Sequence, residues 1–375
     1  MNSSQLFENL GSPPAADEFE LTLFGPGVGE CILMHFGNGE WFVVDSCVFA
    51  GSKSPVVTDY LDAMGVDPKK AVRGILATHW HDDHVAGLSK LVRRCPDAFF
   101  VISGALEPSQ FFSLILEVEE RNKLVKATST ATEFATILDD KLESGRQRHI
   151  PDMLASDGSR LYQGGFCDLV SVQALSPSAA TIQATLSNLA RQLCTDMPTR
   201  KFRRFSPNDL SVALQVSAGP IDILLKADLE DCPQPQVGWK AVLQSPFRPK
   251  KKSQMVKVGH HGSSNADNDQ VWADMIESKP WCVVTPYSKL KEPLPREADL
   301  ARLSGRTDEL YVTSSLSTGS RIKRRGLERQ IAAATRIRRP VNRQSGFVRI
   351  RFGLGRSPIP DIQLFGAAHR HGRVS

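Results

Sequence analysis

His79-Trp80-His81-Asp82-Asp83-His84 places four side chains of metal-binding type within six residues. The apolar residues 71–78 before it predict a buried strand, and apolar positions at helical spacing follow over residues 85–92. Because the backbone turns where a strand gives way to a helix, these side chains can converge on one point. The stretch therefore predicts an open metal-binding loop at the end of a strand.

The donor groups of this loop indicate which ions it would bind. Neutral imidazole and carboxylate suit Zn²⁺, Mn²⁺ or Fe²⁺, and the lack of cysteine makes the loop less specific for zinc. We expect His79 and His81 to bind one ion. A second ion would bind Asp83 and His84.

Two downstream segments supply further candidates. Asp228 ends the mostly apolar stretch IDILLKAD at 221–228, and His260-His261 follows MVKVG at 255–259. A carboxylate at Asp228 could bridge two ions about 3.5–4 Å apart. We assign His260 to the metal and His261 to the substrate, although the residues alone leave the reverse assignment open. A plain helix cap at Asp228 and a buried turn at the histidine pair also remain open.

The composition of the 375-residue chain is that of a globular protein, with 41% hydrophobic and 23% charged residues. No apolar run reaches about 18 residues and the N-terminus lacks a signal-peptide pattern, so we expect neither a membrane span nor secretion. The seven cysteines are widely spaced without a Cys-x-x-Cys pair, which argues against a disulfide framework or a structural zinc finger. We therefore expect a cytoplasmic protein.

The hydrophobic pattern predicts alternating strands and helices on either side of a mostly helical region. In the first half we expect strands at 19–24, 31–36, 40–45 and 71–78, a hairpin turn at Asn38-Gly39, and helices at 56–64 and 85–92. The region 107–205 is expected to be a helical insertion, with periodic stretches at 111–118 and 179–193. In the second half we expect strands at 210–217, 221–227, 255–258, 281–285, 310–313 and 347–352, and a helix at 297–303.

Several motifs in order resemble the metallo-β-lactamase fold, and within it the ComEC-type hydrolase module. The stretch 79–84 matches the HxHxDH motif of that superfamily, and Asp45 ends a strand where the aspartate of its first motif stands. GVGECIL at 27–33 is similar to VGxGDxxLI, with glutamate for aspartate, and NDLSVAL at 208–214 is similar to NxxSLVL. KADLE at 226–230 and KVGHHGS at 257–263 resemble the motifs TGDxE and KVGHHGS.

The resemblance implies an α/β fold, a four-layer αβ/βα sandwich with two mixed β-sheets, outer helices, and metals at the edge where the strand-end loops meet. With it we divide the chain into a flexible N-terminal arm (1–18), a metallo-β-lactamase-like hydrolase domain (19–320), a basic insertion (321–345), and a last strand with a C-terminal tail (346–375). The module would stand alone and soluble, without the membrane channel of competence proteins, so transport is not implied.

Two departures from the family pattern concern the metal ligands. Many members supply a further histidine where this chain has Asn208-Asp209, and His149 lies in a polar linker that we interpret as a solvated loop. Lys291-Glu-Pro293 stands where related modules often carry Gly-His-Pro. One ion could therefore be held weakly, and we expect a divalent cofactor of one or two ions, Zn²⁺ or Mn²⁺.

We expect the protein to be a phosphodiesterase, and most specifically a DNA-cleaving nuclease, that uses a metal-activated hydroxide. Asp45 would orient the histidine loop by hydrogen bonding. The expected catalytic residues are Asp83, His261 and Asp45. His261 would stabilise the phosphorane oxygens or protonate the leaving group.

The expected substrate contacts combine polar residues near the metals with a late basic segment. Residues 321–356 contain twelve Lys or Arg and one acid, a balance that suits contact with a phosphate backbone. The residues expected to bind substrate are Ser263, Lys226, Asn208, Arg324, Arg325, Arg338 and Arg339. The basic insertion could equally contact a partner protein or nothing at all.

Three other functions stay open. The protein could cleave small-molecule or cyclic-nucleotide phosphodiesters, or act as another hydrolase of the same fold, of lactamase or thioesterase type. It could also be a catalytically weak subunit that binds nucleic acid or a partner. Because similar standalone modules occur in bacterial defence or competence systems, a partner protein from such a system is a further expectation.

Overall fold

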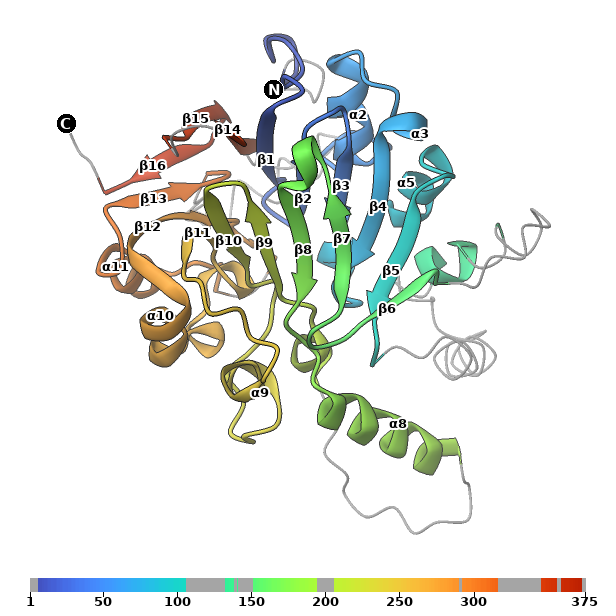
Figure 1. Ribbon diagram of the computed structural model, residues 1–375, viewed down its shortest axis with the longest axis vertical. Coiled ribbons are helices and arrows are strands. Elements are labelled where there is room, and N and C mark those ends of the chain that lie inside the picture. The colour runs from blue at the N-terminus through green and yellow to red at the C-terminus, as the bar shows by residue number, and fades with distance from the viewer. Residues whose placement is uncertain are drawn as a thin grey trace, which may run out of the picture.

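Two β-sheets face each other at the centre of the computed structural model (Figure 1). The structure describes residues 6–105, 132–137, 140, 151–193, 206–289, 292–315, 345–355 and 359–372. Within these residues each sheet has eight strands. Both sheets are mixed, since each joins a block of antiparallel strands to a block of parallel ones.

The first sheet has the order β15-β14-β1-β2-β3-β4-β5-β6. Its strands are β1 (Glu18–Gly25), β2 (Cys31–His35), β3 (Trp41–Val44), β4 (Val72–Ala77), β5 (Phe99–Ser103), β6 (Met153–Ala155), β14 (Gly346–Gly353) and β15 (Asp361–Gly366). The strands from β3 to β6 run parallel, and the others are antiparallel to their neighbours.

The second sheet has the order β16-β13-β12-β11-β10-β9-β8-β7. Its strands are β7 (Arg160–Gly164), β8 (Val170–Ala174), β9 (Leu214–Ala218), β10 (Ile221–Leu225), β11 (Ser253–Lys257), β12 (Ile276–Val284), β13 (Glu309–Val312) and β16 (His369–His371). Here the strands from β10 to β13 run parallel.

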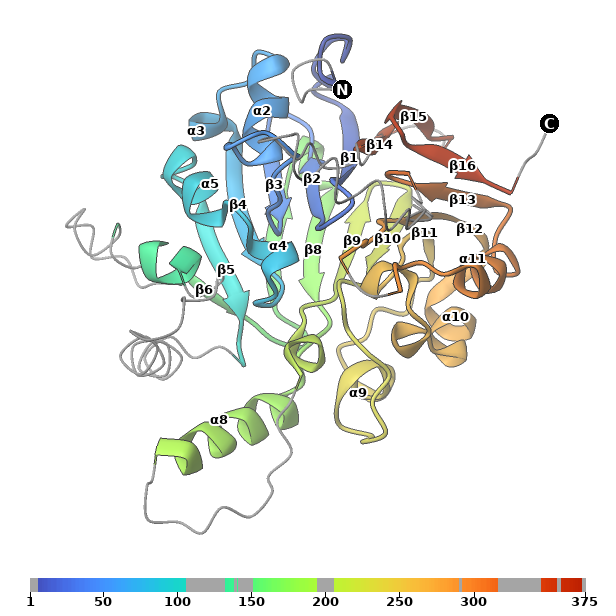
Figure 2. The same ribbon diagram turned by 180° about the vertical axis from the view of Figure 1, so that it is seen from behind.

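Helices lie outside the two sheets, where most of them cover a sheet face, whereas α8 (Ala179–Leu193) extends away from the sandwich (Figures 1 and 2). They are α2 (Val56–Ala63), α3 (Pro68–Ala71), α4 (Asp82–Val85), α5 (Leu88–Arg94), α8 (Ala179–Leu193), α9 (Gly238–Gln244), α10 (Asp269–Met275) and α11 (Glu297–Ser304), with short 3₁₀ turns at Phe166–Asp168, Pro207–Leu210, His260–Gly262 and Ser264–Ala266. No helix in the described part of the chain is both long and apolar enough to cross a membrane.

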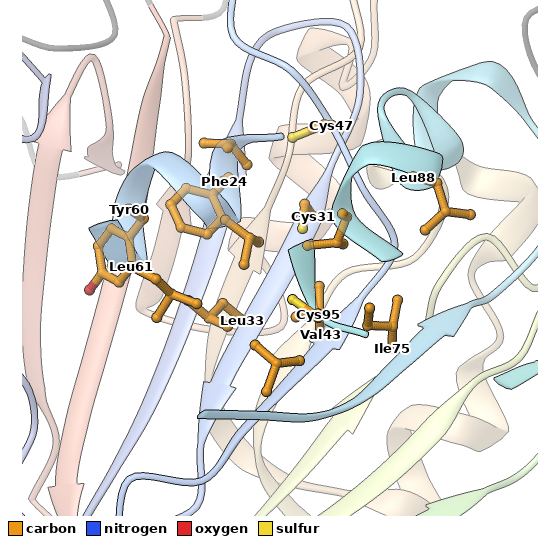
Figure 3. Packing of buried hydrophobic residues seen from close by; sticks show 14 of the residues in the cluster. Phe24, Cys31, Leu33, Val43, Cys47, Tyr60, Leu61, Ile75, Leu88 and Cys95 are labelled. Atoms are coloured by element: carbon orange, nitrogen blue, oxygen red, sulfur yellow. The ribbon is translucent and has the colours of Figure 1, made fainter. Parts of the chain in front are cut away.

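The strand pattern explains the layers. In β1, Leu21 and Leu23 belong to the apolar cluster between the two sheets, whereas Phe24 belongs to the cluster under the helices, because successive side chains of a strand point to opposite faces. Figure 3 shows the helix-side cluster, in which Tyr60 of α2 packs near Phe24 and Leu33. A third cluster lies between the second sheet and its helices, so the expected four-layer sandwich with two mixed sheets is confirmed.

The region 107–205, expected to be helical, contains three strands of the sandwich in its described part. They are β6, β7 and β8. In β8 the buried side chains alternate as Val170, Val172 and Ala174, but the strand has only five residues and gives a weak sequence signal. The helix expected at 179–193 is present as α8, and the stretch 111–118 lies outside the described residues.

Described residues near both ends of the chain pack on the fold. In the segment 1–18, which we expected to be a flexible arm, Leu6, Phe7 and Leu10 are buried in the helix-side cluster. The C-terminal tail forms β15 on the first sheet and β16 on the second. Apolar residues were too few in either segment to predict this packing from local pattern.

Candidate metal centre

The candidate site lies at one edge of the sandwich, where parallel strands end. Asp45 follows β3, the 79–84 loop follows β4, and Asp228 and the pair at 260–261 follow β10 and β11. Parallel strands present their carboxyl ends at the same edge, so residues far apart in sequence meet there. The four segments expected from the sequence are thus brought together.

Two groups of candidate ligands share Asp228. In the first, one atom each from His79, His81 and Asp228 lie within 4.8 Å of one another. His79 Nε2 is 3.2 Å from His81 Nδ1 and 4.0 Å from Asp228 Oδ2. The pairing of the first two histidines is the arrangement expected from the sequence.

The second group consists of Asp83, His84, His261 and Asp228, again with ligand atoms within 4.8 Å. Asp228 Oδ2 lies 3.4 Å from His84 Nε2 and 3.9 Å from His261 Nε2. Because the same oxygen faces both groups, Asp228 stands where a carboxylate bridging two ions would stand.

Hydrogen bonds fix which ring nitrogens face the clusters. His84 Nδ1 donates to Asp45 Oδ2 at 2.7 Å, and His261 Nδ1 donates to the Thr285 carbonyl at 2.8 Å. A carboxylate and a carbonyl can only accept, so both rings carry a hydrogen on Nδ1 and turn Nε2 toward Asp228. Asp45 also accepts from the backbone N–H and the hydroxyl of Thr78, and so holds the start of the loop.

His79 is oriented in the same way by hydroxyl groups. Its Nδ1 lies 3.0 Å from Thr78 Oγ1 and 3.2 Å from Ser211 Oγ. Since the Thr78 hydroxyl donates to Asp45, it accepts from His79 Nδ1. Ser211 also accepts from the backbone N–H of Asp228, so one hydroxyl links His79 with the carboxylate residue that both groups share.

Unsatisfied buried atoms test whether these residues suit a cation. His84 Nε2, which faces Asp228 Oδ2, is buried and has no well-formed hydrogen bond within the described residues. An unsatisfied buried polar atom costs about 1–3 kcal/mol, whereas a divalent ion bound at this nitrogen would satisfy it. The mixed imidazole and carboxylate donors also suit such an ion, so the residues fit a divalent metal.

The electrostatics of the buried groups point the same way. Burial lowers the pKa of His79 well below its ordinary value, and the neighbouring His84 adds to this. For His84, burial also lowers the pKa, but Asp228, Asp45 and Asp83 outweigh it and raise the pKa well above the ordinary value. In Asp228, burial raises the pKa, and the nearby His84 and His261 more than reverse that effect. The site is a set of strongly interacting charges.

Backbone strain gathers at this edge. Asp45, Ala227, His260 and His261 all have positive φ values of 62°, 43°, 43° and 52°. Residues other than glycine rarely adopt this left-handed conformation, which costs about 1–3 kcal/mol and persists at functional sites. At the histidine pair it turns two consecutive rings into the same region.

The two adjacent histidines, which we assigned to the metal (His260) and the substrate (His261), differ in burial and in their neighbours. His261 is buried with its Nε2 in the second group, 3.1 Å from Asp83 Oδ2. His260 is 19% exposed, with Nε2 4.0 Å from Asp228 Oδ2. Its Nδ1 lies 3.0 Å from Asn265 Oδ1 and 3.3 Å from Glu230 Oε1.

Of the residues expected to contact substrate, two lie beside the site and one is buried away from it. Asn208 adjoins the site, and its amide donates to Glu230 Oε1 at 2.8 Å. Ser263 is half-buried and follows the histidine turn. Lys226, in contrast, is 1% exposed, and its ammonium packs against the rings of Trp239 and Trp272. This interior position contradicts the expected phosphate contact, since the long lysine stem carries the charge away from the site.

Four of the residues expected to bind substrate lie outside the described residues. They are Arg324, Arg325, Arg338 and Arg339. His149, Lys291 and a second basic cluster, at residues 200–204, also lie outside them. A third basic cluster, with Arg248, Lys250, Lys251 and Lys252, is described, and it precedes β11, at the opposite end of that strand from the histidine pair.

Two buried charged residues were not singled out from the sequence. Lys257 ends β11, and Glu30 lies in the loop after β1. Their side chains form an ion pair under the ligands. Each occurs in a motif that carries the family resemblance, and this was the only signal in the sequence.

Comparisons with known proteins agree with this geometry. Residues 24–138 match the family model described as the metallo-beta-lactamase superfamily. This segment is therefore similar to the metallo-β-lactamase superfamily. The match includes Asp45 and the 79–84 loop, and it supports a hydrolase of that superfamily. Among curated proteins no match was found.

Two solved structures have a backbone path similar to that of this chain. One is the metallo-beta-lactamase fold protein YhfI from Bacillus subtilis, with 12% identity and a TM-score of 0.38, over 79% of this chain and 95% of that one. The other is AbOPH, a hydrolase in the beta lactamase superfamily, with 15% identity and a TM-score of 0.32, over 58% of this chain and 72% of that one. The ComEC-type module remains a prediction, because no comparison addresses it.

Proposed function

We propose that the protein is a metal-dependent hydrolase that cleaves phosphodiester bonds in nucleic acid. The observation that carries the proposal is the position of Asp228, whose Oδ2 faces both ligand groups. Two ions sharing a carboxylate are the arrangement used for in-line displacement at phosphorus. When bound, such ions would polarise the phosphoryl oxygen and supply an activated water.

The chain's own residues hold and orient this centre. Asp45, Thr285 and the Thr78 hydroxyl accept the Nδ1 hydrogens of His84, His261 and His79, which keeps the Nε2 of these three rings directed inward. His261 is buried among the ligands, so the partly exposed His260 is the imidazole that we assign to the substrate. We assign to its Nε2 the role of holding a proton for the departing oxygen.

The attachment points of the basic insertion favour nucleic acid as the substrate. Gly346, where β14 begins, pairs with Gly25 at the end of β1. Thr313, which precedes the insertion, lies so close that a Cβ on Gly25 would fall 2.1 Å from its Oγ1. The loop after Gly25 leads to Glu30, whose backbone N–H donates to the Asp83 carbonyl. The arginine-rich segment therefore leaves and rejoins the fold at the edge that carries the site.

A small phosphodiester is the second candidate substrate. The reason is that the described basic cluster at 248–252 lies away from the histidine pair, so it offers no contact for a long phosphate backbone beside the metals. A five-residue strand such as β11 spans about 17 Å, so this cluster cannot hold a phosphate at the metals.

The test compares cleavage of supercoiled plasmid, single-stranded DNA and bis(p-nitrophenyl) phosphate with added Zn²⁺, Mn²⁺ or Mg²⁺. We expect metal-dependent DNA cleavage that the His79→Ala/His81→Ala variant loses. Substituting Arg324, Arg325, Arg338 and Arg339 by alanine should raise KM for DNA and weaken its salt dependence, by about 0.9 in the log–log slope per lost contact. The small ester should be cleaved unchanged by this variant.

Cleavage of the small ester alone would support the second candidate. Metal binding without any hydrolysis of either phosphodiester would reject the proposed activity. In that case chromogenic lactams and thioesters would be tested next. Tight DNA binding without bound metal would instead indicate a binding subunit.

A further inference from the structure

A buried ammonium group lies directly beneath the bridging carboxylate. Lys257 Nζ is 3.8 Å from Asp228 Oδ1 and donates to the Ala227 carbonyl at 3.1 Å. The same ammonium forms an ion pair with Glu30. All three charged side chains are at most 3% exposed. This contact is fixed from several sides and is shielded from water.

The two oxygens of Asp228 therefore face different partners. Oδ1 faces the ammonium of Lys257, whereas Oδ2 lies within 4.0 Å of four imidazole nitrogens. Rotation of the carboxylate would exchange these surroundings. We propose that Lys257, held by Glu30, is a positioning residue that keeps Oδ2 of Asp228 directed at the two metal sites.

Glu30 is itself tied to the ligand loop. Its backbone N–H donates to the Asp83 carbonyl at 3.1 Å. One carboxylate oxygen lies 3.9 Å from His84 Nδ1, and the other lies 3.7 Å from His261 Nδ1. The Glu30–Lys257 pair thus connects the backbone of one ligand with the carboxylate of another.

A purely structural ion pair would behave differently. Replacing a buried pair by uncharged side chains of similar size is often neutral for folding or stabilising. If the pair only filled the interior, its joint replacement would leave the metal site unchanged. If it positions Asp228, the metal site should weaken while the fold persists, because groups that orient metal ligands typically contribute about 10–100-fold to affinity.

The experiment uses the double variant Glu30→Gln/Lys257→Met, which removes one negative and one positive charge and so keeps the net charge of the site. The inference rests on the proposed metal centre, so the wild type is measured first by Co²⁺ titration with absorption spectroscopy and by competition with a chelator. We expect the variant to bind metal about 10–100-fold more weakly, with a changed Co²⁺ ligand-field spectrum. The control variant Lys226→Met removes another buried ammonium, which lies away from the two ligand groups. It should keep the wild-type metal affinity and spectrum.

Each outcome decides one question. Wild-type affinity and spectrum in the double variant would overturn the positioning role while leaving the proposed function intact. No metal binding by the wild type would overturn both. If the double variant does not fold, Glu30→Asp replaces it, since this change keeps the charge and withdraws the carboxylate from Lys257 by one methylene. It should weaken metal binding in the same direction, and unchanged binding would overturn the inference.

Discussion

Three imidazole rings at the site share one arrangement. His79, His84 and His261 each direct Nδ1 at a group of the protein that accepts its hydrogen, so Nε2 is left for a ligand. His81 differs, since its Nδ1 faces the first group. The sequence motif identifies the residues, but these hydrogen bonds determine which nitrogen of each ring is available to bind a metal ion.

Asp45→Asn tests the role of the carboxylate behind His84. An amide can present its NH₂ group to His84 Nδ1, which removes the preference for the required tautomer. We expect metal affinity or kcat to fall by about 10–100-fold with the fold retained. Isothermal titration with Zn²⁺ and Mn²⁺ measures the affinity. Unchanged binding would show that Thr78 and the backbone suffice to orient the loop.

Substitutions of the two adjacent histidines should differ in their effects on metal content and on kcat. His261→Gln removes a buried ligand candidate, so bound metal should decrease. His260→Gln should leave the metal content unchanged but lower kcat by about 100-fold or more if this ring supplies a proton. Metal analysis of both purified variants, together with kcat, distinguishes the roles. The reverse pattern would restore the assignment that we made from the sequence.

The β2–β3 hairpin contains a histidine whose hydrogen bonds require an uncharged imidazole ring. His35 Nδ1 donates to the Glu18 carbonyl at 2.9 Å, and its Nε2 accepts from the Gly39 backbone N–H at 3.1 Å. Protonation would place two donors opposite each other at Nε2. Burial, the largest effect, lowers the pKa of His35 to about 4.

This histidine should make the hairpin sensitive to acid. Because the folded pKa lies below the unfolded value of about 6.5, the unfolded chain binds more protons and stability falls as the pH drops between these values. The expected loss from pH 7 to pH 4 is roughly 3 kcal/mol. Urea unfolding of the wild type and His35→Gln at several pH values isolates this contribution as a difference. Identical pH slopes would contradict it.

The N-terminal segment should stabilise the fold despite its polar appearance. The Phe7 ring lies 6.0 Å from Phe49, 5.9 Å from Tyr60 and 5.8 Å from Phe347, measured between ring centroids. Phe7→Ala should therefore lower the free energy of unfolding by about 3 kcal/mol. Phe247→Ala, at a position 61% exposed, should change it by less than about 0.5 kcal/mol. Equal effects of the two variants would contradict the anchoring role.

The elements that the sequence predicts well are those with strong local signals. The Asn38-Gly39 hairpin and the run before His79 were located within a residue or two, because alternation and continuous apolar runs report burial directly. The strand β7 was missed because only Leu161 is fully buried in it. Its place in the sheet depends on partners far away in sequence, which no local pattern contains.

At the site, the sequence predicted residue types better than roles. The ligand groups form from motifs that were recognised, but the burial of Lys226 and the exchange between His260 and His261 depend on the direction of each side chain. The ion pair of Glu30 with Lys257 joins two strand ends and has no local signature. Such features follow from packing rather than from spacing along the chain.

For the whole molecule, metal binding should be coupled to stability. Four acidic side chains, Glu30, Asp45, Asp83 and Asp228, are buried at one edge, and an ion that binds them only in the folded state would stabilise the fold. We expect a chelator to lower Tm and added Zn²⁺ or Mn²⁺ to restore it, with a stabilisation of about 2.7 kcal/mol when free ion is 100 times Kd. Thermal melts measure this, and Asp228→Asn should respond far less. A Tm unaffected by chelator would contradict the coupling.

The pairing of β1 with β14 has a consequence for how the molecule is made. Each residue of β1 from Glu18 to Gly25 finds its partner between Gly353 and Gly346, more than 300 positions later in the chain. While the ribosome is still translating the residues between them, one edge of β1 has no native neighbour, and such an edge is open to pairing with other chains. Because the chain is made from its N-terminus, this edge of β1 stays open to pairing with other chains until residue 353 has emerged from the ribosome.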